Sequence, residues 1–100
     1  MYDLKYLEKL SRFKELTPSA WDAFEKLDNA ALADGTIPQK MKELIAIAVA
    51  HTTQCPYCIE IHAGKARKAG ASDQEIAEAI FTSAALRAGA AVVHGVHCFK

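Results

Sequence analysis

Apolar residues recur every three or four positions along most of this chain, a spacing that places them on one face of an α-helix. The pattern is clearest near the start, at Leu4, Leu7, Leu10 and Phe13. No segment alternates apolar and polar residues between hairpin turn residues, so no strand is expected. One hundred residues without a linker or a repeat are enough for a single domain. We therefore predict an all-α fold of five to six helices, with residues 1–100 as one domain.

Proline, glycine and capping residues divide this pattern into segments. The expected helices cover residues 2–16, 18–34, 38–51 and 56–70, a fifth begins at residue 73, and residues 52–54 form a short polar break. Thr17 is expected to cap the second helix, and Gly70 to end the fourth in a left-handed conformation. Ser72 and Glu75 have the spacing of a capping box. Gly89 either breaks the fifth helix or lets another backbone approach closely.

The charges indicate neither a nucleic-acid nor a membrane partner. Twelve basic and twelve acidic residues cancel, whereas nucleic acids and acidic membranes attract a concentrated basic excess. The longest strictly apolar run, residues 44–50, is far shorter than the ~18 residues of a membrane span. Asp3 and Lys5 charge the N-terminus at once, so no signal peptide is expected. Three cysteines do not suggest a disulfide framework, and we expect a cytoplasmic protein with reactive thiols.

The segment that carries chemistry lies around a Cys-x-x-Cys motif. Cys55 falls at the expected N-cap of the fourth helix and Cys58 in its first turn. The positive end of the helix dipole favours the thiolate form and lowers a thiol pKa. The spacing also puts both sulfur atoms on one face, close enough for a reversible disulfide. His62, four residues after Cys58, occupies the next turn of the same face.

Helix geometry adds Glu43 to this group. If the third and fourth helices form an antiparallel hairpin, Glu43 comes level with about residue 64, within a turn of His62. The carboxyl group is then expected to lie against the apolar stripe that contains Ile47. Because desolvation raises a carboxyl pKa, Glu43 is a candidate general base near neutral pH.

Glu43, Cys55, Cys58 and His62 resemble the core of the alkylhydroperoxidase D-like family, within the carboxymuconolactone decarboxylase-like superfamily. The family pattern is a glutamate, eleven intervening residues, Cys-x-x-Cys, three residues and a histidine, and this chain matches every interval. The stretch A-G-K-A-R-K-A-G-A-S looks similar too, so the resemblance covers about residues 20–95. It implies an all-helical bundle with the Cys-x-x-Cys at a helix N-terminus, homotrimers or homohexamers, and thiol-dependent peroxide reduction.

These observations assign a role to each residue. Cys58 is the expected attacking thiol because it alone has a base on the next turn, and the family resemblance points the same way. Cys55 is the expected resolving thiol, although its N-cap position favours its own activation. Glu43 and His62 are expected to carry protons. We expect a small hydroperoxide as substrate, a dithiol reductant such as lipoamide or a thioredoxin-like protein, a peroxiredoxin as a possible client, and no cofactor or metal.

Other interpretations of the same residues stay open. Cys-Pro-Tyr-Cys is also the glutaredoxin signature, but there it follows a β-strand. A zinc site would need two further ligands, and the candidates are His62, His94, His97 and Cys98. The alternative within the same fold is a non-catalytic or electron-relay module that serves a partner peroxiredoxin. Lactone decarboxylation is disfavoured because the superfamily's decarboxylases lack the cysteine pair.

Two further features bear on the function. The resembling peroxidases carry a second histidine directly before the second cysteine, where this chain has Tyr57. A tyrosine donates hydrogen bonds but relays few protons at pH 7, which puts efficient catalysis in doubt. Residues 44–50 are apolar on every face of their helix and residues 83–93 are rich in alanine. Five short helices cannot cover both, so the protein is expected to be a homo-oligomer.

Overall fold

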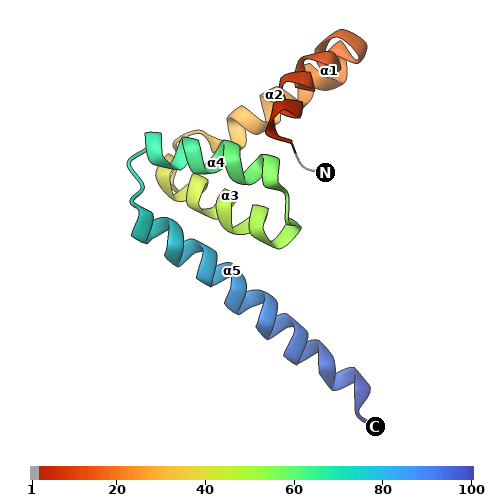
Figure 1. Ribbon diagram of the computed structural model, residues 1–100, viewed down its shortest axis with the longest axis vertical. Coiled ribbons are helices and arrows are strands. Elements are labelled where there is room, and N and C mark those ends of the chain that lie inside the picture. The colour runs from red at the N-terminus through yellow and green to blue at the C-terminus, as the bar shows by residue number, and fades with distance from the viewer. Residues whose placement is uncertain (1–2) are drawn as a thin grey trace.

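The computed structural model describes residues 3–100, and all the regular structure there is helical. The elements in chain order are η1 (Leu4–Leu10), α1 (Ser11–Leu16), α2 (Pro18–Leu32), α3 (Gln39–Thr53), α4 (Pro56–Lys68), α5 (Asp73–His94) and η2 (Gly95–Cys98), where η denotes a 3₁₀ helix. The all-α prediction is therefore confirmed, with five α-helices. Figure 1 shows an arm made of η1, α1 and α2, a central hairpin of α3 and α4, and a long α5 that leaves the hairpin.

The first expected helix is divided in the structure. Residues 4–10 form a 3₁₀ helix, with Asp3 as its N-cap, and α-helical geometry begins only at Ser11. The leucines at 4, 7 and 10 repeat every three residues, which matches the three residues per turn of a 3₁₀ helix. The prediction of one continuous α-helix is thus wrong here, and its first residue lies outside the described part of the chain.

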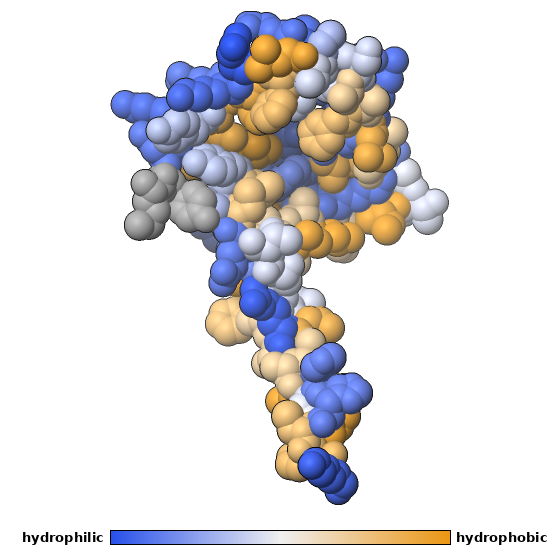
Figure 2. All heavy atoms as spheres, turned by 90° about the vertical axis from the view of Figure 1, so that its right-hand side faces the viewer, coloured by the Kyte–Doolittle hydropathy of each residue, from blue (hydrophilic) through white to orange (hydrophobic). Residues whose placement is uncertain are grey.

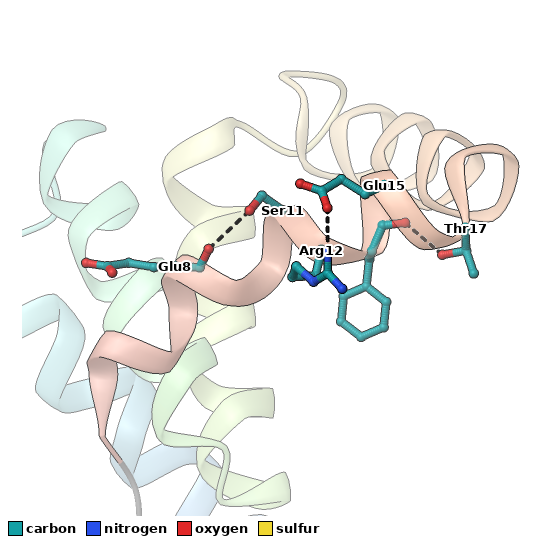
Figure 3. Close-up of polar contacts among 6 residues, drawn as sticks. Glu8, Ser11, Arg12, Glu15 and Thr17 are labelled. Carbon is teal, nitrogen blue, oxygen red and sulfur yellow. Dashed lines mark hydrogen bonds and ion pairs between the residues drawn. The ribbon is translucent and has the colours of Figure 1, made fainter.

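The junction between α1 and α2 also differs from the prediction. Thr17 occupies the N-cap position of α2, but its hydroxyl donates to the carbonyl oxygen of Phe13 at 2.8 Å instead of accepting from α2. Figure 3 shows this contact together with the Ser11–Glu8 hydrogen bond and the Arg12–Glu15 ion pair. Thr17 therefore closes the end of α1, and Pro18 begins α2 without help from a side-chain cap.

The α3–α4 hairpin holds most of the small core. Ile47 and Ala66 are almost completely buried where the two helices meet, and Leu44 from α3 and Ile76 from α5 complete the same cluster with Ala71. The predicted break at residues 52–54 is wrong in part, because α3 continues through Thr53. Gln54 ends it in the left-handed conformation, with φ of 56°.

The start of α5 follows the sequence signals. Gly70 has the expected positive φ of 96°, and the Ser72–Glu75 capping box is present with both hydrogen bonds. Gly89 does not break the helix, which runs through to His94. An ion pair of 3.0 Å between Lys40 and Glu75 ties the first turn of α5 to α3.

The C-terminal turns of α5 project away from the rest of the chain (Figure 1). Figure 2 shows apolar side chains exposed along this projecting part. The exposed large apolar side chains of α5 and η2 are Phe81, Leu86, Val92, Val93 and Val96. The radius of gyration is 16.5 Å, larger than the ~13 Å of a compact domain of this length. Residues 73–98 are the one described segment long and apolar enough to cross a membrane by length and composition.

Candidate functional site

The turn between α3 and α4 positions both thiols of the motif. The left-handed Gln54 redirects the chain, and Cys55 follows in an extended conformation as the N-cap of α4. Pro56 supplies the first helical residue, where a missing N–H is tolerated. The backbone N–H of Cys58 donates to the sulfur of Cys55 at 3.3 Å. The Cys-x-x-Cys therefore lies at a helix N-terminus, as the sequence predicts.

The two sulfur atoms form a hydrogen-bonded dithiol. They lie 2.9 Å apart, and both cysteines are free and half-buried. The hydrogen bonds from the Cys58 side chain and backbone lower the pKa of the Cys55 thiol. The same shared hydrogen bond, burial and the charge on Cys55 raise the pKa of Cys58 to about 11. The shared hydrogen bond therefore moves the pKa values of the two thiols in opposite directions, lower for Cys55 and higher for Cys58.

Glu43 from α3 and His62 from α4 meet in the interior of the hairpin. The Nδ1 atom of His62 lies 2.7 Å from Oε1 of Glu43. The Glu43 side chain is 1% exposed and that of His62 is 17% exposed. No hydrogen-bond partner reaches the other carboxylate oxygen of Glu43 among the described residues. The carboxylate fixes the imidazole orientation and leaves the Nε2 atom of His62 to exchange protons with a reacting group.

A groove connects His62 with the second thiol. It has a volume of about 350 Å³, within the range of small-molecule sites. One stripe of α3 forms its long wall, α2 covers one side, and Cys58 and His62 belong to its α4 side. The lining residues are Ala31, Leu32, Lys42, Ile45, Ala46, Val49, Ala50, Thr53, Cys58 and His62. Cys55 is absent from this lining, so a molecule in the groove meets Cys58 first.

The other predicted ligand candidates lie elsewhere. The ring centroids of His94 and His97 are 5.0 Å apart at the far end of α5. Cys98, which follows His97 in the sequence, is exposed. Within residues 3–100, no three His, Cys, Asp or Glu side chains converge as they would around a metal ion. The structure thus brings together Glu43, His62 and the cysteine pair, and leaves the C-terminal histidines apart.

Two residues at the site were missed from the sequence. Lys42 lines the groove, and its position on the α3 stripe four residues before Ala46 could have indicated this. Arg87 donates a hydrogen bond of 2.8 Å to the carbonyl oxygen of Thr52 and so ties α5 to the end of α3. The contact between Arg87 and Thr52 could not be predicted from a local sequence pattern, because 35 residues separate the two positions.

Comparisons with known proteins agree with this architecture. A model of the carboxymuconolactone decarboxylase family matches residues 18–100. The crystal structure of a carboxymuconolactone decarboxylase family protein from Legionella pneumophila, in its apo form, superimposes with a TM-score of 0.78 at 33% identity. That match covers 82% of this chain and 73% of the other. A protein from Methanobacterium thermoautotrophicum superimposes with a TM-score of 0.82 at 31% identity, over 88% of this chain and 99% of that one.

The curated relatives are themselves uncharacterized. "Uncharacterized protein 4 in cox locus" of Paracoccus denitrificans is 52% identical over 73 residues, which is 73% of this chain and 66% of that protein. An uncharacterized protein of Cupriavidus necator is 36% identical over 63% of this chain and 56% of its own length. The matched region therefore spans between about half and two thirds of these relatives.

Proposed function

The chain belongs to the carboxymuconolactone decarboxylase family, and we propose that it is a thiol-dependent reductase of hydroperoxides. One observation carries the proposal: Cys58 shares a groove with a histidine whose other ring nitrogen is held by a buried carboxylate. A thiol beside an oriented base is the arrangement of an activated sulfur nucleophile. The hydrogen-bonded partner thiol, Cys55, is in position to form a disulfide with it.

The chemistry balances with these groups alone and an external dithiol. The Cys58 thiolate attacks the outer oxygen of a hydroperoxide, the O–O bond breaks, and the alcohol leaves after it gains a proton. Cys58 becomes a sulfenic acid. Cys55 then gives up its thiol proton and attacks this sulfur; the S–O bond breaks, the leaving hydroxide takes up that proton as water, and the Cys55–Cys58 disulfide forms. A dithiol reductant returns both cysteines to thiols and is itself oxidised to a disulfide.

Proton transfer is the step for which Glu43 and His62 are suited. Because the pKa of Cys58 is about 11, its thiol needs a base before it can attack near neutral pH. His62 takes that proton, and the buried Glu43 carboxylate stabilises the imidazolium that forms. The same imidazolium then protonates the leaving alkoxide. The lowered pKa of Cys55 eases the loss of its proton in the resolving step.

A second hollow, lined by Tyr57, is the proposed place of approach for the reductant. Tyr57 replaces the second histidine of the resembling peroxidases, and with Tyr6, Leu7 and Leu10 it lines a small apolar hollow where η1 approaches α4. Tyr57 follows Cys55 by two positions in the sequence, and the hollow is separate from the groove that Cys58 lines. We assign it to the approach of the dithiol reductant, a lipoamide or a thioredoxin-like protein.

The exposed surface of α5 supports an assembly of several copies. Its large apolar side chains lack cover from the rest of the described chain, and a soluble protein does not leave a patch of this kind open. We propose a homotrimer or homohexamer in the cytoplasm, in which α5 packs against neighbouring copies through its small residues. A closed ring buries the same face on each copy.

Peroxide consumption in the presence of several candidate reductants tests the proposal. Dihydrolipoamide, a thioredoxin system and glutathione are supplied in turn with the purified protein and tert-butyl hydroperoxide. We expect consumption that depends on both cysteines and on a dithiol. An electron-relay module would consume no peroxide alone and would do so only after a peroxiredoxin is added, which would contradict the proposed direct reaction.

A further inference from the structure

A lysine that peroxide reduction alone does not require belongs to the lining of the groove beside Cys58. Lys42 lines the groove together with Cys58 and His62. Its Nζ donates a hydrogen bond of 2.7 Å to the carbonyl oxygen of Ala33, at the end of α2. An ammonium group has three N–H donors, so two remain. Among residues 3–100, no ion pair involves Lys42.

The cation and the thiol lie at different places along the groove. Because Glu43 and His62 are hydrogen-bonded across the hairpin, Cys58, four residues nearer the turn, lies level with about residue 47 of α3. Five residues separate this level from Lys42, or ~7.5 Å at ~1.5 Å per residue. A helical side chain leans toward the N-terminus, which carries the ammonium further away. The ammonium and the sulfur are therefore on the order of 10 Å apart along the helix axis.

The wall between these two groups is apolar. Ile45 and Ala46 on α3 and Leu32 on α2 form it. An aliphatic chain buried there gains about 25 cal/mol for each Å² removed from water. A ligand complementary to the whole groove has an apolar chain, a reactive group beside the sulfur and an anion at the other end. A carboxylate pairs with an ammonium group through charge-assisted hydrogen bonds.

We propose that this groove binds aliphatic carboxylates, and that the hydroperoxide reduced at Cys58 is one with a carboxylate at the far end of its chain. The binding of carboxylates is inferred from Lys42 and the apolar wall. The reduction of a carboxylate-bearing hydroperoxide rests in addition on the proposed function. The carboxylate pairs with Lys42, the chain lies along Ile45 and Ala46, and the peroxide group reaches Cys58 and His62. Uncharged alkyl hydroperoxides leave Lys42 unpaired and bind less tightly.

The first part is tested without peroxide, by protection of Cys58 against alkylation. A variant with Cys55→Ser and Cys98→Ser keeps Cys58 as its one cysteine. Its alkylation by iodoacetamide is followed by mass spectrometry with decanoate or decanamide present. Both compounds have the same chain and differ in charge. We expect decanoate to protect at a concentration about threefold to fivefold lower than decanamide, as for a partly exposed ion pair.

Changes at two lysines of α3 distinguish the groove from general charge effects. Lys42→Met should abolish the preference for decanoate, and Lys42→Arg, which keeps the cation, should retain it. Lys40→Met removes the same charge from a residue that pairs with Glu75 outside the groove, and it should leave the preference unchanged. Circular dichroism spectra check that each variant keeps its helices.

Several results would overturn the inference. Equal protection by decanoate and decanamide would remove the role of Lys42, as would a preference that survives Lys42→Met. No protection by either compound would show that the groove is closed to ligands, for example by another copy of the chain. If decanoate protects as expected but the protein consumes no hydroperoxide, the carboxylate site stands and the proposed function fails.

Discussion

Oε1 of Glu43 and Nδ1 of His62 lie 2.7 Å apart, although nineteen positions separate the two residues in the sequence. The contact joins α3 to α4 beside the cysteine pair and buries the carboxylate almost completely. A carboxylate that is hydrogen-bonded to one ring nitrogen fixes the orientation of the imidazole and leaves the other ring nitrogen free for proton transfer. In the proposed mechanism, His62 is therefore the base that activates Cys58, and the carboxylate acts through it.

Replacement of either residue should slow the reaction of Cys58 with peroxide. We expect His62→Gln to reduce the rate of sulfenic acid formation by about 10²–10⁴-fold, because a positioned base contributes that much. Glu43→Gln keeps an oxygen that can accept from Nδ1 but removes the charge that stabilises the imidazolium. It also places an amide nitrogen where Oε2 has no partner, at a cost of about 1–3 kcal/mol in stability. Stopped-flow measurement of sulfenic acid trapping checks the rates, and thermal unfolding checks the stability.

His51 is a matched control for these two variants. It lies in the last turn of α3 with its Nδ1 atom 2.8 Å from the carbonyl oxygen of Ile47, and it does not line the groove. His51→Gln should therefore leave the rate of sulfenic acid formation within twofold of the unmodified protein. A loss as large as that of His62→Gln would contradict the role assigned to His62.

The cysteine pair should show opposite pKa changes when its members are replaced. The side-chain hydrogen bond to Cys55 and the charge on Cys55 raise the pKa of Cys58 to about 11. Cys55→Ser removes the thiolate charge, so the pKa of Cys58 should fall toward the ordinary value of ~8.5. Cys58→Ala should raise the pKa of Cys55, since the side-chain hydrogen bond that lowers it is lost. Iodoacetamide rates measured against pH give both values, and a Cys58 pKa that stays near 11 in Cys55→Ser would contradict this account.

The capping box should couple folding to pH on the acid side. The hydrogen bonds from the backbone of Ser72 and the side chain of Lys40 lower the pKa of Glu75. Its folded pKa is thus below its unfolded value, so the stabilisation is present above the unfolded pKa of ~4.3 and is lost as pH falls through the folded value. Lys40→Met should weaken this loss between about pH 5 and pH 3. Ser72→Ala should cost about 1 kcal/mol at neutral pH.

Urea unfolding at several pH values measures both effects. Arg67→Met is the comparison variant. Arg67 of α4 forms an ion pair with Asp73 of α5, and because both side chains are largely exposed, this pair is expected to contribute little to stability. It should change stability at neutral pH by less than Ser72→Ala does. An acid dependence that is identical with and without Lys40 would contradict the role of the Lys40–Glu75 contact.

A charge on the projecting part of α5 should disrupt the proposed assembly. Val93 is exposed and lies six residues after Arg87, which hydrogen-bonds to Thr52. Val93→Glu would bury a carboxylate in the proposed interface between copies. Light scattering should then show a lower mass than the unmodified oligomer. Gln74→Glu adds the same charge in the first turn of α5, where it favours the helix dipole, and should leave the mass unchanged. A mass near 10.9 kDa for the unmodified protein at micromolar concentration would contradict the assembly.

Local signals in the sequence predicted most of the fold. The prolines, Gly70 and the Ser72–Glu75 box gave helix boundaries to within a few residues, since each acts through its own backbone or its near neighbours. The errors arose where two local preferences competed. The leucines at residues 4, 7 and 10 are spaced by three residues, which favoured a 3₁₀ helix over an α-helix. The hydroxyl of Thr17 donated to a carbonyl oxygen of α1 instead of capping α2.

The site was predictable where helix geometry sufficed. An antiparallel pairing of the third and fourth helices predicted Glu43 within a turn of His62, and the two side chains are in direct contact in the structure. The groove and the Lys42 side chain in it were not predictable, because they depend on how α2 covers the α3 stripe across a six-residue loop, residues 33–38. The position of Arg87 against Thr52 depends likewise on the angle between α5 and α3.

Sulfenic acid formation in two single-cysteine variants tests the central claim most directly. Each variant carries Cys98→Ser together with either Cys55→Ser or Cys58→Ser, and each is mixed with one equivalent of hydroperoxide and a sulfenic acid trap. The account predicts rapid trapping at Cys58 in the Cys55→Ser variant and none at Cys55 in the Cys58→Ser variant. Rapid trapping at Cys55, with none at Cys58, would contradict it, because the thiol outside the groove would then be the one that attacks.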